Sequence, residues 1–202
     1  MIVSHKHYFR KTKRLTIRSL NKNDYNAWKK AYTTILPQKN FWDRTTNRPL
    51  IELTKSKFNA LLKEQSQKRK TEEFCDYGIF LNNSGEYIGR ISLMNFVRSV
   101  TQSSFVGYTL FNPHWGRGYA EEALKAIVDI AFKDHKLHRI VAGIEPQNKR
   151  SHKLVKKLKF RKEGTSKKVV FLRGAWQDLV QYALTTEDVN LKWLGKIKVR
   201  KQ

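Results

Sequence analysis

The stretch Asn112–Leu124 reads NPHWGRGYAEEAL and decides the fold. Its last residues have helical spacing, yet Gly116 and Gly118 stand near the helix start, where a Ser, Thr or Asp cap is usual. Each glycine weakens a helix, but a helix N-terminus offers unpaired N–H groups and a partial positive charge that bind phosphate. Glycines let the backbone approach the ligand, and Arg117 adds a positive charge. The stretch therefore predicts a phosphate cradle.

Two well-known phosphate motifs do not fit this stretch. The P-loop pattern, a glycine followed after four residues by Gly-Lys-Ser/Thr, is absent. The dinucleotide pattern GxGxxG matches Gly116 and Gly118 but meets Glu121 at its third small position, where an acid would repel a pyrophosphate. Both motifs are set aside.

Hydrophobic periodicity around this stretch predicts a mixed α/β chain. A meander of strands at 77–81, 87–96 and 104–111 precedes the helix, and alternation resumes after it. The full expected order is strand 14–19, helix 21–36 capped by Asn21 or Asn23, helix 51–69, the three meander strands, helix 118–133, strand 138–144, helix 148–159, and strands 169–172 and 179–184 around a turn at 173–174.

Length and composition predict one domain over residues 1–202, with a basic arm at about 1–13 and a basic tail at about 189–202. No apolar run approaches the roughly 20 residues of a membrane span, so no membrane partner is expected. The first residues, MIVSHKHYFRKTKR, lack the apolar segment of a secretory signal. The single cysteine, Cys75, fits a reducing compartment and predicts a cytoplasmic protein.

The charge of the chain is strongly one-sided. Lys and Arg total 41 against 17 for Asp and Glu, a net charge of +24 that attracts polyanions and repels cations. A general lysine bias should also raise glutamate, which is an equally good exposed helix former. We therefore expect an anionic partner, although zinc-finger spacing and RNA-recognition strand motifs are missing.

Four segments together carry a family resemblance. They are GYTLF at 107–111, WGRGYAEEAL, a strand ending IEPQN and the helix NKRSHKLVKKLKF. In this order they resemble the Gcn5-related N-acetyltransferase (GNAT) superfamily. The resemblance implies an α/β fold with a central mixed sheet, splayed between two parallel strands and flanked by helices. It also implies acetyl-CoA as co-substrate, with its pyrophosphate in the glycine-rich turn, and no metal.

Within the superfamily, the chain resembles the ribosomal-protein alanine N-acetyltransferase group. The segments are NFVRS at 95–99, HRIVAG at 138–143, PQNKRS at 146–151 and GAWQDLVQYALTTED at 174–188. That group implies direct acetyl transfer, through a tetrahedral intermediate, to the N-terminal α-amine of a ribosomal protein that begins with Ala or Ser. The cofactor contacts that it implies are Tyr108, Thr109, Leu110, Trp115, Gly116, Arg117, Gly118, Tyr119, Ala120, Asn148, Arg150 and Ser151.

The chain departs from the superfamily pattern at three positions. Trp115 replaces a Gln or Arg, which a mostly backbone cradle tolerates, and Lys159 replaces a glycine at a helix end. Val155 stands where many members carry the tyrosine that protonates the leaving thiolate. The proton must then come from another group.

The remaining candidates for catalysis each have an alternative role. Ser151 could protonate the sulfur or make only a first-turn backbone contact. Glu145 could be the base for an α-amine whose pKa is about 7.7 to 8.0, or a surface acid. Asn148 could hold the pantetheine arm, as the resemblance implies, or cap its helix. A backbone N–H near Thr109 or Leu110 could support the oxyanion.

Several other residues could also have a function. Cys75 is expected in the core because no histidine is placed to activate it. His5 and His7 lack further metal ligands at a usable spacing. The stretch 37–53 could be a substrate loop or a plain connector. Basic residues crowding one helix could meet the phosphates of coenzyme A: Lys149, Arg150, Lys153, Lys156 and Lys157.

Three functions remain open from the sequence. The first is the ribosomal-protein N-acetyltransferase, whose surplus charge would face ribosomal RNA or a pre-ribosome. The second is an acetyltransferase for a small amine, such as a polyamine or aminoglycoside, although a chain of +24 repels cations. The third is a catalytically silent protein that binds acetyl-CoA and RNA. The oligomeric state is left open.

Overall fold

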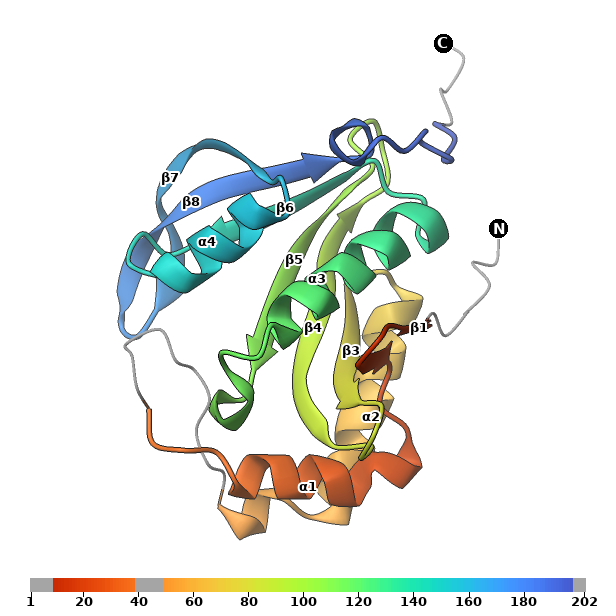
Figure 1. Cartoon of the computed structure of the whole chain (residues 1–202), viewed down its shortest axis with the longest axis vertical. Coiled ribbons are helices and arrows are strands. Elements are labelled where there is room, and N and C mark those ends of the chain that lie inside the picture. Colours follow the sequence, from red (N-terminus) through yellow and green to blue (C-terminus); the bar gives the residue numbers. More distant parts are fainter. Residues whose placement is uncertain (1–8, 39–48, 198–202) are drawn as a thin grey trace. The chain divides into compact units, whose positions relative to one another are not determined.

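The computed structural model describes residues 9–38 and 49–197. Eight strands form a mixed sheet in the order β1-β2-β3-β4-β5-β6-β8-β7, which confirms the expected α/β class (Figure 1). The strands are β1 Phe9–Lys11, β2 Leu15–Arg18, β3 Phe74–Leu81, β4 Tyr87–Val97, β5 Ser103–Leu110, β6 Arg139–Ile144, β7 Arg161–Leu172 and β8 Ala175–Thr185. The α-helices are α1 Tyr25–Thr33, α2 Lys55–Lys70, α3 Tyr119–Asp129 and α4 Lys149–Lys157.

The contacts divide the chain into two compact units. The first unit comprises Met1–Met94 and Gly107–Ile130, and the second comprises Asn95–Val106 and Ala131–Gln202. Strands β1 to β3 pair antiparallel with their neighbours in the first unit. In the second unit β5 and β6 run parallel over Ser103–Phe105 and Arg139–Val141, while β8 pairs antiparallel with both β6 and β7.

An aromatic core holds the helices of the first unit on its strands. The buried rings of Trp28 and Phe58 lie 5.1 Å apart between α1 and α2, and those of Tyr87 and Phe111 lie 5.4 Å apart. Helix α2 packs against β3, and α3 packs against β1 and β2. Figure 1 shows these two helices on opposite faces of the strands. Large buried rings of this kind dominate the energetics of a core.

Local signals set the start of the first helical segment. The Asn21 side chain accepts from the N–H of Asn23, and the Asp24 carboxylate accepts from the N–H of Asn21 at 2.7 Å. This capping box begins a 3₁₀ turn at Lys22–Asp24, and α1 follows directly. The expected helix at 21–36 and its cap are confirmed, with an earlier end at Thr33.

Several expected boundaries are wrong in informative ways. The basic arm contains strand β1, Phe9–Lys11, which pairs with β2 although two of its three residues are charged. The helix expected from residue 51 begins only at Lys55, after a separate 3₁₀ turn and a Thr54 cap. Strand β7 starts at Arg161, eight residues before the expected strand. Its first half was not expected because the side chains there are mostly exposed and charged, which hides the pattern of a strand. The α-helical part of 118–133 ends at Asp129 and continues as a π-helical turn at Ile130–Asp134.

Two further expectations concern single residues and termini. Cys75 is fully buried in β3, which confirms its place in the core. His5, His7 and most of the stretch 37–53 lie outside the described residues. None of the helices within 9–38 and 49–197 has both the length and the apolar character needed to cross a membrane.

Candidate functional site

The glycine-rich turn lies between β5 and α3 in the first unit. A 3₁₀ turn at Asn112–His114 follows β5, and Gly116 and Gly118 then take left-handed backbone angles, with φ of +78° and +76°. Gly118 is the N-cap of α3, and no side chain caps that helix. Both glycines therefore adopt a left-handed backbone conformation that residues with a side chain can adopt only with strain.

The surroundings of the turn are open. A Cβ placed on Gly116 would meet no atom within 4 Å, and residues 116–118 are exposed. The first N–H groups of α3 have no partner within their own helix and carry its positive dipole end. An exposed, uncapped helix start with a left-handed glycine turn fits the phosphates of a nucleotide-bearing co-substrate such as acetyl-CoA.

Trp115 ties this turn to the end of β5. Its indole Nε1 donates to the carbonyl oxygen of Leu110 at 2.7 Å. On the neighbouring strand β4, a Cβ on Gly89 would lie 2.4 Å from the carbonyl oxygen of Thr109, so only glycine permits this close approach. The departure from the superfamily at Trp115 thus has a structural role, because its indole holds the turn to Leu110 at the end of β5.

A second anchor comes from the N-terminal strands. The Glu122 carboxylate, in the first turn of α3, accepts from the Thr12 hydroxyl at 2.6 Å and from Arg14 Nε at 2.7 Å. Arg14 Nη1 also donates to the carbonyl oxygen of Arg117 at 2.8 Å, and its guanidinium lies 4.7 Å from the centre of the Tyr119 ring. We call Thr12, Arg14 and Glu122 the Arg14 clamp.

The contacts of the Arg14 clamp lower the pKa of the Glu122 carboxyl. Burial alone raises the pKa of Glu122, but the hydrogen bonds from Thr12 and Arg14, together with the charge of Arg14, lower this pKa overall. Glu122 is therefore ionised at neutral pH. An ionised Glu122 also interacts favourably with the positive end of the α3 dipole, because it lies in the first turn of that helix.

The remaining candidates lie on β6 and α4 of the second unit. Asn148 caps α4, because its Oδ1 accepts from the N–H of Ser151 at 3.1 Å. The capping role of Asn148 is confirmed, and its contact with pantetheine stays a prediction. Ser151 makes that first-turn contact through its backbone, which leaves its half-buried hydroxyl to other partners. Val155, at the position of the missing tyrosine, is fully buried.

Glu145 is not the surface acid that one alternative describes. Only 6% of Glu145 is exposed, and its carboxylate forms an ion pair with the guanidinium of Arg173. Its carbonyl oxygen lies 3.1 Å from His152 Nε2, and His152 Nδ1 lies 3.0 Å from the hydroxyl oxygen of Tyr182. The carboxylate is thus held by Arg173 from the β7–β8 turn, while the base role stays a prediction.

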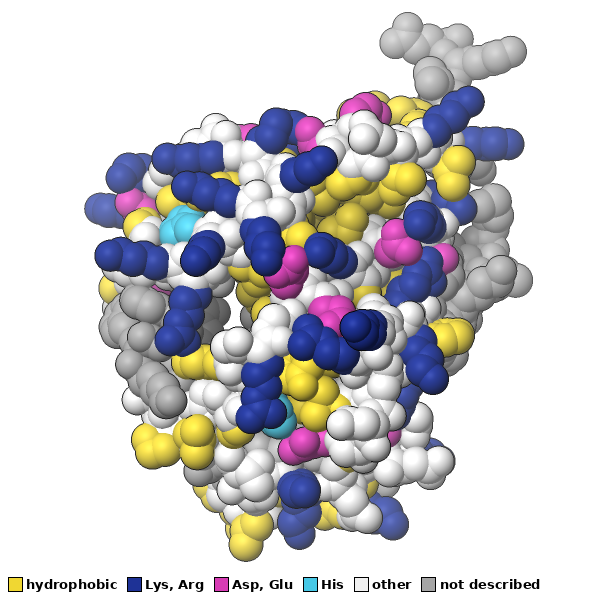
Figure 2. Space-filling model, viewed as in Figure 1, with side chains coloured by type: hydrophobic (Ala, Val, Ile, Leu, Met, Phe, Trp, Pro, Cys, Tyr) yellow, Lys and Arg dark blue, Asp and Glu magenta, His cyan; other side chains and the backbone are white. Residues whose placement is uncertain are grey.

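Positive charge covers the exposed side of α4. The side chains of Lys149, Arg150, Lys153, Lys156 and Lys157 are all exposed. Figure 2 shows Lys and Arg side chains scattered over the face in view, with far fewer acids among them. A field of this sign attracts phosphates over a range set by the ionic strength.

The Arg14 clamp and the partners of Glu145 could not be predicted from the sequence. Arg14 and Glu122 are 108 positions apart, and Glu145 and Arg173 are 28 positions apart, so no local pattern links either pair. A sequence shows only that each charged residue exists. The partner is decided by strand pairing and by a turn, neither of which a short motif encodes.

The chain is similar to known acetyltransferases in its sequence. The sequence model of the acetyltransferase (GNAT) domain matches residues 14–161. The probable N-acetyltransferase YjcK of Bacillus subtilis (strain 168) is 39% identical over 124 residues, which are 61% of this chain and 68% of that protein. A ribosomal protein uS5-alanine N-acetyltransferase of Escherichia coli (strain K12) is 37% identical over 112 residues, 55% of this chain and 58% of that protein.

The solved structures agree with the fold described above. Mycobacterium smegmatis RimJ in complex with CoA-disulfide superposes with a TM-score of 0.71 at 22% identity, over 87% of this chain and 84% of that one. At this identity the likeness establishes the fold alone.

Proposed function

The chain belongs to the GNAT acetyltransferase family, and from that premise we propose that it moves the acetyl group of acetyl-CoA to the N-terminal α-amine of a ribosomal protein. The expected first residue of the acceptor is Ala or Ser. The E. coli relative carries the name of an enzyme with this kind of substrate. A cytoplasmic location is part of the same proposal.

The observation that carries the proposal is the left-handed Gly116–Gly118 turn at the uncapped start of α3. This geometry presents backbone N–H groups to a pyrophosphate without steric obstruction. The solved RimJ structure of the same fold was obtained with a CoA derivative, which supports acetyl-CoA as the co-substrate. The residues on either side of the turn complete the proposed set of cofactor contacts in this unit: Tyr108, Thr109, Leu110, Tyr119 and Ala120.

The chemistry assigned to individual side chains follows from three needs of acyl transfer. The amine must lose a proton, the developing oxyanion needs a donor, and the departing sulfur needs a proton. We assign these roles to Glu145, to a backbone N–H at Thr109 or Leu110, and to the hydroxyl of Ser151. Asn148 and Arg150 are assigned to the pantetheine arm and the phosphates.

The charge of +24 exceeds what one coenzyme can use, so the proposal includes ribosomal RNA or a pre-ribosome as a second partner. Binding to RNA releases counter-ions, so the affinity for ribosomes should fall steadily as salt is added. A plot of log affinity against log salt concentration should be a straight line, with a slope of about −0.7 to −0.9 for each phosphate contact. Co-sedimentation with ribosomes at increasing salt measures this slope. Salt-insensitive association, or no association at low salt, would contradict the RNA partner.

The experiment that tests the function uses purified protein, labelled acetyl-CoA and a total ribosomal-protein extract. Mass spectrometry then locates any added acetyl group. Label on the α-amine of one or a few proteins supports the proposal and identifies the substrate. Label only on added polyamine or aminoglycoside would favour the small-amine alternative. Acetyl-CoA binding without any transfer would favour the catalytically silent alternative, which the Val155 substitution permits.

A further inference from the structure

Two aromatic side chains lie exposed near the turn of the β7–β8 hairpin in the second unit. Phe171 is 57% exposed and Trp176 is 60% exposed. They are directly opposite each other on the two strands, with ring centroids 5.6 Å apart and ring planes at 69°. In such an edge-to-face pair, each ring keeps at least one face that the other ring does not cover. The hairpin therefore presents open aromatic faces to a partner.

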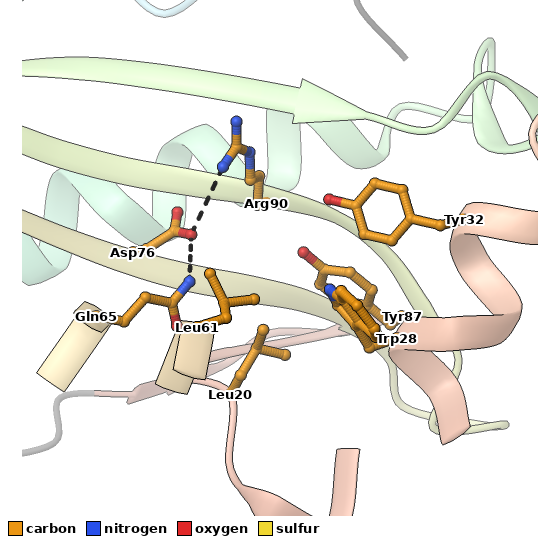
Figure 3. Close-up of a pocket in the computed structure, with 8 residues that line it drawn as sticks. All are labelled: Leu20, Trp28, Tyr32, Leu61, Gln65, Asp76, Tyr87 and Arg90. Carbon is orange, nitrogen blue, oxygen red and sulfur yellow. Dashed lines mark hydrogen bonds and ion pairs between the residues drawn. The ribbon is translucent and has the colours of Figure 1, made fainter. Parts of the chain in front are cut away.

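Aromatic side chains of the first unit are used differently. Figure 3 shows Trp28, Tyr32 and Tyr87 around a small pocket lined by residues of α1, α2, β3 and β4. Trp28 is only 3% exposed and Tyr87 only 2%, so the core covers these rings and gains stability from their burial. The exposed pair of the hairpin adds far less to a core. Packing alone therefore does not account for two large rings at this place.

The exposed pair lies on the same face of the sheet as α4. The ring of Tyr182 on β8 lies 5.5 Å from that of His152 on α4, so even-numbered side chains of β8 point to the face that α4 covers. Strand β8 is continuous over Ala175–Thr185, and the register shifts of the hairpin add residues only to β7. Because side chains alternate along a strand, Trp176 points to that face, and Phe171 opposite it does so too.

Positive charge dominates the second unit. The unit contains twenty Lys and Arg residues against six Asp and Glu residues. The exposed basic side chains of α4 lie on the same side of the sheet as the aromatic pair, and the hairpin adds the exposed Lys162, Lys167 and Lys168. Figure 2 shows Lys and Arg side chains gathered where Figure 1 places α4 and this hairpin. The α4 side of this unit therefore attracts phosphates.

Open rings within a positive surface fit one class of partner best. A single-stranded nucleic acid brings phosphates for the charge and unpaired bases that stack on aromatic side chains. A duplex keeps its bases stacked inside, so it cannot use the rings in this way. A second copy of this chain would bring the same positive charge, and like charges disfavour association.

We propose that the β7–β8 hairpin binds single-stranded RNA, with a base stacked on the Phe171–Trp176 pair. Lys168 and the exposed lysines of α4 contact the phosphates on either side of that base. The inference rests on the proposed function, because it assigns the RNA partner to one surface of the second unit. It also limits the RNA to segments whose bases are unpaired.

The test measures the affinity of the full chain for two labelled strands by fluorescence anisotropy. One strand is oligo(A) of about 12 nucleotides, and the other is an abasic strand of the same length, which keeps the phosphates but lacks the bases. Trp176→Leu keeps an apolar side chain and removes the aromatic face. It should weaken oligo(A) binding about fivefold or more, the value of one stacked base, and leave the abasic affinity unchanged. Trp176→Phe should restore most of the oligo(A) affinity.

A matched control is Phe105→Leu on β5 of the same unit. Phe105 is 40% exposed and pairs with Val141, whose odd position on β6 places both side chains on the face opposite α4. This variant should bind both strands as wild type does. Thermal unfolding reports the stability of each variant, and the ratio of the two affinities within one variant cancels any uniform loss of folded protein. An equal loss for both strands in Trp176→Leu, or no loss for oligo(A), would overturn the inference.

Acetylation of an acceptor peptide without RNA separates this inference from the proposed function. Binding of oligo(A) through Trp176, in a protein that acetylates no peptide or ribosomal protein, would overturn the enzymatic function and support the hairpin site. Acetylation of ribosomal-protein N-termini, with equal oligo(A) affinity in wild type and Trp176→Leu, would support the function and overturn the inference. A Trp176→Leu variant that loses peptide acetylation but keeps its oligo(A) affinity would also overturn it, because the hairpin would then dock the acceptor protein.

Discussion

Glu122 and Arg14 are joined by two hydrogen bonds, from the Arg14 side chain at 2.7 Å and from its backbone N–H at 2.8 Å. The same guanidinium donates to the carbonyl oxygen of Arg117, which lies between the two left-handed glycines. The start of α3 is thus fixed from the N-terminal strands. This arrangement orders a glycine-rich segment that would otherwise have wide conformational freedom.

Substituting Arg14 should weaken the binding of coenzyme A through its phosphates. In Arg14→Met the Arg117 carbonyl loses its donor and the turn loses a nearby positive charge, so we expect the dissociation constant of acetyl-CoA to rise about tenfold. S-acetylpantetheine, which lacks the pyrophosphate, should bind Arg14→Met and wild type equally. Isothermal titration calorimetry with both compounds measures the contrast.

The control for this prediction is Arg10→Met. Arg10 Nε lies 3.5 Å from Asp129 Oδ2 near the other end of α3, so this variant removes a partly exposed ion pair between the same strands and helix. Its acetyl-CoA affinity should match wild type. An equal loss for acetyl-CoA and S-acetylpantetheine in Arg14→Met would mean that the clamp maintains the fold without specifically ordering the phosphate turn.

The lowered pKa of Glu122 predicts how stability depends on pH. A carboxylate whose pKa is lower in the folded than in the unfolded protein stabilises the fold above the unfolded pKa of about 4.3, and this contribution is lost as pH falls through the folded value. Glu122→Gln should therefore lower the free energy of unfolding by about 1 to 3 kcal/mol at pH 7. The difference from wild type should shrink below about pH 4.

Urea unfolding of wild type and Glu122→Gln from pH 3 to pH 7 measures this difference. Glu121→Gln is the matched control, because Glu121 pairs with Lys125 on the surface of the same helix, a contact of about 0.5 kcal/mol or less. A Glu122→Gln deficit that stays constant across the whole range would show that the carboxylate charge does not carry the stabilisation.

Patterns that repeat within one element could be predicted from the sequence, and contacts between distant elements could not. The period of 3.6 identified α3, and the Asn21 and Asn148 caps were visible because a cap and its target lie within three residues. Strand β1 escaped prediction because its three residues, Phe9–Lys11, show no alternation by themselves. The first half of β7 escaped because exposed charged residues lack the β-branched pattern of a strand.

The same distinction applies to the residues of the candidate site: those that act within one turn could be predicted, and those that act through distant partners could not. Gly116 and Gly118 were predicted from chemistry that is local to one turn, and the structure adds their positive φ. Arg14 and Arg173 were not predicted because each acts through a partner on another element. Their own neighbours in the sequence show nothing unusual.

The two glycines can be tested separately from general backbone strain. Gly116→Ala forces a side chain into the left-handed region, which costs about 1 to 2 kcal/mol of stability. Gly85→Ala is a close control, because Gly85 has φ of +69° and open surroundings but lies in the β3–β4 turn. Both variants should lose similar stability in urea unfolding. Only Gly116→Ala should raise the KM for acetyl-CoA, by about tenfold or more. Equal KM values in the two variants would contradict the phosphate cradle.

The ion pair of Glu145 and Arg173 allows the proposed base to be separated from a structural acid. Glu145→Gln and Arg173→Met both break the pair, but only the first removes the carboxylate. Arg173→Met should be the less stable variant in urea unfolding, because it leaves a buried negative charge without its partner. If Glu145 accepts the proton of the amine, Glu145→Gln should lower kcat about 100-fold or more, whereas Arg173→Met should retain most activity. If kcat instead falls in both variants only as far as each variant loses stability, the carboxylate of Glu145 holds the β7–β8 turn. The base would then be a different group.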